Sequence, residues 1–147
     1  MNFYKHFIGD YGRATGDLSI TEHGAYRLML DHFYGTGKPL PADKKALYRL
    51  LRAESDTDKR AIDSVSLRFW KPLPDDLGTI YGWLDLRKDE DKSLYNRVAS
   101  GWTDYGLINV RALGEILKAA AVGDRNRKIA IDREARRRTE SCEGGAK

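Results

Sequence analysis

The sequence has very little of what disulfide-bonded, secreted or membrane-spanning proteins require. Cys142 is the one cysteine, so an internal disulfide cannot form and a reducing compartment is expected. No stretch approaches the roughly 20 apolar residues that span a membrane. Residues 1–8 also lack the apolar run of a signal peptide. Together these absences predict a soluble, cytoplasmic protein with no membrane partner.

Patterns for catalysis and metal binding are also scarce. The histidines are His6, His23 and His32, and no pattern of cysteines or carboxylates frames them as metal ligands. Glu22-His23 does not extend to the zinc-protease pattern, because Arg27 stands where a second histidine is needed. No glycine-rich loop leads into the Lys-Ser or Lys-Thr pair of a phosphate-binding loop. We therefore expect no enzyme activity, no metal and no cofactor.

Positive charge is concentrated near the end of the chain. The formal net charge is +4 over 147 residues. The first 110 residues are neutral, with 16 Lys and Arg against 16 Asp and Glu, and the remainder has 10 against 6. A neutral body with a basic tail is typical of a protein that meets an anionic polymer. The alternative is a solvated tail with no partner.

Three short helices are predicted in the first half of the chain. The first begins at a capping box formed by Ser19 and Glu22, and residues 35–37 end it. The second is expected to begin at Asp43 or at the Pro41-Ala42 pair, and the third at Ser55; Asp43 and Ser55 are good N-cap residues. Apolar residues recur at helical spacing in each segment.

A β-hairpin is predicted after these helices. Residues 79–86 contain β-branched and aromatic residues in a rough alternation, which indicates a strand returning against a first strand at residues 69–73. A helix is expected from Lys88, and another from Asn109 until Gly123 ends it.

The predicted order of elements is that of a winged helix-turn-helix. An extended arm or short strand at residues 3–8 leads through a turn at residues 9–12 into the three helices and the hairpin. In such a fold the third helix enters the major groove and the hairpin contacts the backbone or the minor groove. The predicted fold class is therefore α+β, mostly α. We expect a winged-helix-like domain at residues 1–100, a helical extension at 101–123 and a partly disordered, arginine-rich tail at 124–147.

Basic residues in three segments are candidates for DNA binding. Arg can bind guanine through two hydrogen bonds, and Lys and Ser can bind phosphate, whereas the alternative for each segment is an ordinary solvated surface. The third predicted helix contributes Lys59, Arg60, Ser64 and Arg68, and the second contributes Lys44, Lys45 and Arg49. The tail contributes the strongest cluster, namely Arg125, Arg127, Lys128, Arg133, Arg136, Arg137 and Arg138.

Several short motifs at fixed distances resemble the YdaU-like family of prophage replication-associated proteins, over about residues 1–96. The motifs are Tyr4-Lys5-His6, Ile8-Gly9-Asp10-Tyr11, Leu18-Ser19, Glu22-His23-Gly24-Ala25-Tyr26, Leu30-Asp31, the stretch Pro39–Asp43, and Gly82-Trp83 with Arg87, Asp89 and Glu90. Residues 72–80 depart from the short turn expected before Gly82-Trp83. The resemblance implies a winged-helix-like fold and a role in phage replication.

Two functions follow as expectations. The first is a phage or prophage DNA-binding protein of the replication-initiation type, with double-stranded DNA as its partner. The alternative is a protein-interaction module that binds a host or phage replication protein, or a host defence protein, without binding DNA. The neutral charge of residues 1–110 favours this alternative.

Overall fold

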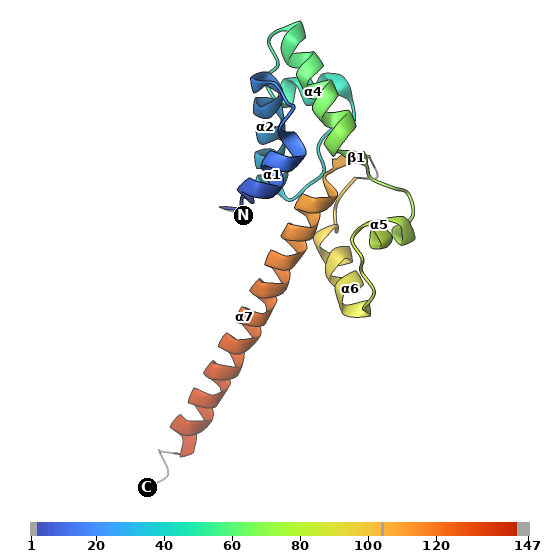
Figure 1. Ribbon diagram of the computed structural model, residues 1–147. Coiled ribbons are helices and arrows are strands. Elements are labelled where there is room, and N and C mark those ends of the chain that lie inside the picture. The colour runs from blue at the N-terminus through green and yellow to red at the C-terminus, as the bar shows by residue number, and fades with distance from the viewer. Residues whose placement is uncertain (1–2, 104, 144–147) are drawn as a thin grey trace.

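The computed structural model describes residues 3–103 and 105–143, and Figure 1 shows a helical body from which one long helix extends. The described chain is mostly helical, with seven helices and one two-stranded antiparallel sheet. In chain order the elements are α1 (Ile8–Thr15), α2 (Ile20–Thr36), α3 (Lys44–Leu50), α4 (Asp56–Phe69), β1 (Lys71–Pro72), α5 (Leu77–Trp83), α6 (Asp89–Val98), β2 (Leu107–Ile108) and α7 (Val110–Glu143).

Helix α2 is the centre of the core, as its apolar spacing predicts. The Ser19 hydroxyl accepts a hydrogen bond from the Glu22 amide, and the Glu22 carboxylate accepts one from the Ser19 amide, so the predicted capping box is confirmed. Gly37 ends the helix at φ 64°, a left-handed conformation that glycine adopts at little cost. Met29 and Phe33 are completely buried between these ends.

Helices α3 and α4 also begin where the sequence predicts. Asp43 caps α3 by accepting a hydrogen bond from the Ala46 amide, and Ser55 with Asp58 forms a second capping box at α4. Helix α4 packs along α2 and buries Val65 completely. The three helices predicted between residues 19 and 69 are therefore confirmed.

The predicted β-hairpin is wrong in its second strand. Strand β1 lies within the predicted first strand, but it pairs with β2, where Lys71 stands opposite Ile108. Residues 77–83 form helix α5, because Asp76 accepts a hydrogen bond from the Thr79 amide and provides an N-cap that the alternation of side chains concealed. The connection between β1 and β2 thus contains α5 and α6.

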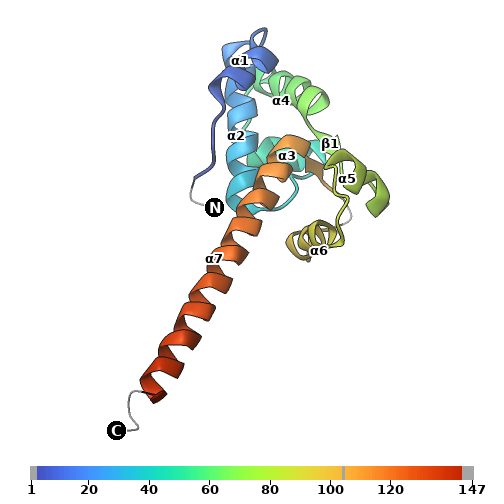
Figure 2. The same cartoon turned by 60° about the horizontal axis from the view of Figure 1, so that its bottom comes forward.

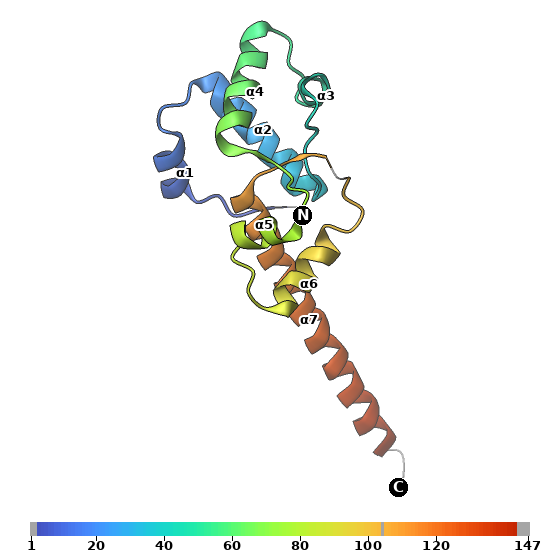
Figure 3. The ribbon, with the colours of Figure 1, turned by 90° about the vertical axis from the view of Figure 1, so that its right-hand side faces the viewer.

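Helix α7 begins at Asn109 as predicted but does not end at Gly123. The Asn109 amide oxygen accepts a hydrogen bond from the Ala112 amide, and the helix then continues to Glu143. One glycine costs about 1 kcal/mol in a helix, and the good helix formers on both sides outweigh it. Arg97 of α6 and Asp124 of α7 form an ion pair where α7 leaves the body. Figures 2 and 3 show the distal half standing clear of the other elements.

The first residues form an arm and a helix. Residues 3–7 lie outside any helix or strand, in agreement with the predicted extended arm. The predicted turn at residues 9–12 is wrong, because these residues lie within α1. Two glycines did not prevent the helix, and Arg111 of α7 forms an ion pair with Asp10 of α1 at 2.8 Å.

Candidate nucleic-acid interface

The predicted recognition residues on α4 lie on the surface, and some have partners within the protein. Arg68 donates hydrogen bonds to both carboxylate oxygens of Asp17 at 2.9 Å and to the Ala14 carbonyl at 3.1 Å. The Arg68 guanidinium lowers the pKa of the Asp17 carboxyl below its usual value. Lys59 lies 5.9 Å from the centre of the Tyr48 ring, whereas Arg60 and Ser64 are exposed. Arg68 therefore tethers the end of α4 to the segment between α1 and α2.

The basic residues of α3 lie next to the acidic side of α4. Lys44 forms an ion pair with Asp63 at 3.5 Å, and the Tyr48 hydroxyl donates a hydrogen bond to the same carboxylate at 2.6 Å. That hydrogen bond raises the pKa of the Tyr48 hydroxyl. Lys45 and Arg49 are exposed and make no ion pair with a described residue. The structure thus brings α3 and α4 together, but it mixes their cations with carboxylates.

The arginine-rich part of α7 presents a different environment. Every side chain from Arg125 to Cys142 is exposed. Arg127 pairs with Asp124 at 3.9 Å and Arg138 with Glu134 at 3.3 Å, both within the helix. Five other cations have no ion pair among the described residues: Arg125, Lys128, Arg133, Arg136 and Arg137.

The three predicted groups do not form one surface. Figures 1 and 3 show α4 at one end of the molecule and the distal half of α7 at the other. A single ligand of small size cannot contact both groups. A long polymer can, and the charge is densest on α7. We define the α7 basic segment as residues 125–138.

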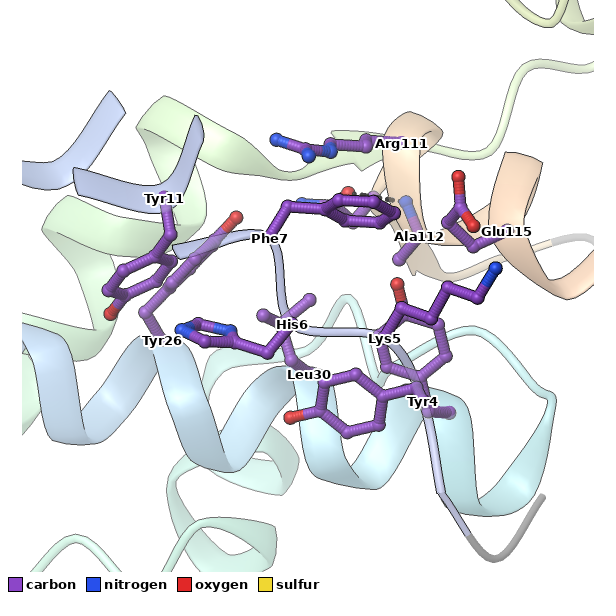
Figure 4. A pocket seen from close by; sticks show the side chains of 12 residues that line it. Tyr4, Lys5, His6, Phe7, Tyr11, Tyr26, Leu30, Arg111, Ala112 and Glu115 are labelled. Atoms are coloured by element: carbon purple, nitrogen blue, oxygen red, sulfur yellow. Dashed lines mark hydrogen bonds between the residues drawn. The ribbon is translucent and has the colours of Figure 1, made fainter. Parts of the chain in front are cut away.

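The motif residues near the N-terminus meet around a small cavity between the arm, α2 and the first turns of α7 (Figure 4). Tyr4 stacks on Tyr34 with ring centres 4.1 Å apart and hydrogen-bonds to Asp31, and the Tyr11 hydroxyl lies 2.7 Å from the His23 ring nitrogen. Burial raises the pKa of Tyr34 to about 12. These motif residues therefore hold the arm in place.

Sequence reasoning missed the partners that α7 supplies to this cluster. Arg111 lies 5.4 Å from the centre of the Phe7 ring, and Asn109 and Glu115 line the same cavity. No local signal links residues about a hundred positions apart. The cavity has a volume of about 40 Å³. It has room for ordered water but is far below the roughly 300 Å³ of a typical ligand pocket.

The described residues offer no cluster of three or more His, Cys, Asp or Glu side chains that could hold a metal ion. Within the same residues, no helix is long and apolar enough to cross a membrane. Among the candidates, the α7 basic segment has the simplest chemistry: a row of cations directed into solvent on a preformed helix.

Comparison with known proteins supports a shorter region of similarity than the residues 1–96 suggested by the sequence motifs. Residues 2–71 match the model of a family described as "Protein of unknown function (DUF1376)". The uncharacterized protein YdaU of Escherichia coli (strain K12) is 36% identical over 58 residues, which are 40% of this chain and 20% of that protein. The chain thus spans about a fifth of the length of this curated relative. No solved structure matches. The match extends from the arm through α4 to β1, and residues 72–96 lie outside it.

Proposed function

We propose that this protein binds double-stranded DNA through the α7 basic segment and acts in the initiation of phage or prophage DNA replication. The observation that carries the proposal is the set of five cations on the exposed half of α7 that make no ion pair with a described residue. Each phosphate that such a cation neutralises releases condensed counterions, which favours binding at low salt. The replication context rests on the resemblance to YdaU-like proteins.

A winged-helix core is the finer fold that we propose for the body. Helices α2, α3 and α4 are the three helices of such a core. Leu107 of β2 forms an isolated antiparallel bridge with Leu40, which follows α2, and β2 also pairs with β1, which follows α4. This arrangement places β2 between β1 and the chain at Leu40. In this interpretation, helices α5 and α6 occupy the connection that forms the wing in other proteins.

A matched pair of variants tests the DNA-binding proposal. The first variant changes Arg125, Arg133, Arg136 and Arg137 of α7 to Gln, which removes charge but keeps a residue of similar helix propensity. The plot of log affinity for a 20–30 base-pair duplex against log salt concentration should become shallower by about 0.9 for each phosphate that is no longer neutralised. Fluorescence anisotropy with a labelled duplex between about 50 and 200 mM salt measures the change.

The control variant removes the same number of cations from the body. It changes Lys45, Arg49, Lys59 and Arg60 of α3 and α4 to Gln. We expect its salt dependence to remain close to that of the unchanged protein. If only this control loses affinity, the interface is on α3 and α4. If the unchanged protein binds no duplex at about 50 mM salt, where phosphate-driven affinity is greatest, the proposal is wrong.

A protein-interaction role is the second candidate, and one surface feature favours it. Leu67 of α4 has 89% of its surface exposed and lies one turn after Asp63, whose carboxylate pairs with Lys44. An exposed apolar side chain on a neutral helix suits a protein partner better than a phosphate backbone. Pull-down from host lysate with and without nuclease distinguishes the two, because a partner held through DNA is lost on nuclease treatment.

A further inference from the structure

The α7 basic segment carries cations on two opposite sides of one helix. Successive residues of an α-helix are about 100° apart around its axis. In the triplet 125–127, Arg125 and Arg127 therefore lie on either side of Asn126. The triplet 136–138 repeats this arrangement three turns later, with Arg136 and Arg138 on either side of Arg137.

The two triplets are in register. Residues eleven positions apart differ by only about 20° around the axis, so Asn126 and Arg137 share one face. Ala130 and Arg133 lie on the same face, at four and seven residues after Asn126. We call this the central face. Arg125 with Arg136 forms one flank, and Arg127 with Arg138 forms the other.

The opposite side of the helix carries one cation, Lys128, among apolar and acidic residues. Ile131, Ala135 and Cys142 lie there, and a shallow groove runs from them onto the flank of Arg127 and Arg138, where Glu134 also lines it. Asp124 and Asp132 also lie toward this side. The ion pairs that Arg127 and Arg138 make are solvent-exposed, and exposed pairs of this kind are weak enough to be exchanged for phosphate.

We propose that the α7 basic segment lies lengthwise in the major groove of B-form DNA, with its central face toward the base edges. This inference rests on the proposed DNA binding and adds its geometry and its ligand. A helix lying across a duplex from outside needs cations on one side only, whereas a helix within a groove has a phosphate backbone on each side. The two arginine flanks match a helix that lies within a groove, because each flank can face one phosphate backbone.

The dimensions agree with this placement. The major groove of B-form DNA is about 12 Å wide, and an α-helix with its side chains is about 10–12 Å in diameter. From residue 125 to 138 the helix extends about 20 Å, at about 1.5 Å per residue. Asn126 and Ala130 are short enough for close approach to the bases, and Arg133 and Arg137 can reach guanine through two hydrogen bonds.

The geometry excludes the other nucleic acids as equal ligands. The major groove of A-form RNA is deep and narrow, so a helix does not fit into it. We expect the full chain to bind a 20-base-pair DNA duplex at least about tenfold more tightly than an RNA duplex of the same sequence at the same salt. Single-stranded DNA of equal length should also bind more weakly than the DNA duplex.

Two variants test whether both flanks bind phosphate. Arg125 and Arg136 are changed to Gln in one, and Arg127 and Arg138 in the other. Each should make the salt dependence shallower by about 1.8, because each leaves two phosphates without a neutralising cation. Methylation of guanine N7, which lies in the major groove, should be reduced in the bound duplex.

The outcomes separate this inference from the function on which it rests. Equal affinity for the DNA and RNA duplexes, an effect of one flank alone, or unprotected guanine N7 would overturn the placement while leaving DNA binding intact. Failure of the full chain to bind any of the three probes would overturn both. Circular dichroism of each variant, with unchanged helix content, excludes loss of the helix as the cause.

Discussion

Substitution of Gly106 by Ala should damage the junction that joins the two halves of the fold. A Cβ atom at this position would lie 2.4 Å from the Pro39 Cβ and 3.2 Å from the Leu40 carbonyl oxygen. The first of these distances is far inside van der Waals separation. Because Pro39 is rigid and Leu40 is completely buried, neither neighbour can move without disturbing the core.

The expected loss of stability can be estimated from the displacement of Pro39 and Leu40 that the new Cβ atom requires. Overpacking in a tight core costs about 1–3 kcal/mol. Moving the segment at Leu40 also weakens its two backbone hydrogen bonds to Leu107, of 2.9 and 2.8 Å, each with a net value of about 0.5–1.5 kcal/mol. We therefore expect Gly106→Ala to lower the free energy of unfolding by about 2–4 kcal/mol. At about 2–4 °C per kcal/mol, the Tm should fall by roughly 5–15 °C.

Urea unfolding followed by tryptophan fluorescence and circular dichroism measures this loss. Gly123→Ala is the matched control, because nothing lies within 4 Å of a Cβ there and α7 is exposed at that point. That control should leave the body unchanged and stabilise the helix by up to about 1 kcal/mol. A Gly106→Ala protein within about 0.5 kcal/mol of the unchanged chain would refute the close approach of Gly106 to Pro39 and Leu40.

Two further predictions concern the start of α7 and the buried tyrosines. Asn109→Ala should lower the free energy of unfolding by about 2–3 kcal/mol in urea titrations, because it removes the cap to the Ala112 amide and leaves the Phe69 carbonyl without its side-chain donor. A loss below about 0.5 kcal/mol would contradict this role. Above pH 10 stability should also fall, because burial raises the pKa of Tyr34 to about 12 and the folded state favours its neutral form. The Tyr34 contribution is complete below pH 10 and declines, by up to about 2–3 kcal/mol, as the pH rises from 10 to 12. Tyr34→Phe should lose less over that interval, and an equal loss in both proteins would exclude Tyr34 as the cause.

Local chemistry made helices α2, α3 and α4 predictable. Ser19, Asp43 and Ser55 each cap a helix by binding an amide three residues later, an interaction that is visible in sequence spacing alone. The apolar residues of α2 that recur at helical spacing are buried, namely Ala25, Tyr26, Met29, Leu30, Phe33 and Tyr34. These features depend on short stretches of chain, so a sequence contains nearly all the information that determines them.

The sheet could not be found in the same way. Strand β1 pairs with residues about 35 positions later, and a pairing of two residues on each strand has no alternation from which to detect it. The alternation at residues 79–86 indicated a strand, whereas the Asp76 cap and burial of Ile80 produce a helix. Tertiary context decided between the two, as it often does for short amphipathic segments.

The cationic residues at the candidate site were predicted individually, but their environments were not. Arg68 and Arg137 look alike in sequence, as basic residues on a helix. In the structure Arg68 donates to Asp17 and to the Ala14 carbonyl, whereas Arg137 is exposed without an ion pair to a described residue. Only the fold reveals this difference, because Asp17 and Arg68 are brought together by the packing of α1, α2 and α4.

The position of α7 explains why the body need not carry positive charge. Asn109 and Arg111 fix the first turn of α7 to Phe69 and Asp10, and Arg97 contacts it again at Asp124. A helix held at its base by several elements needs no further support to keep its direction over its exposed half. The neutral body then supports the base of α7. Positive charge that attracts an anionic polymer is needed only on the half of α7 that extends from the body. In this interpretation, residues 2–71, which match the family model, form most of the supporting body, and α7 provides the proposed DNA-binding surface. If the proposed function holds, Asn109→Ala should lower DNA affinity much less than removal of the arginines, because the proposed phosphate-binding residues lie beyond the anchored turns.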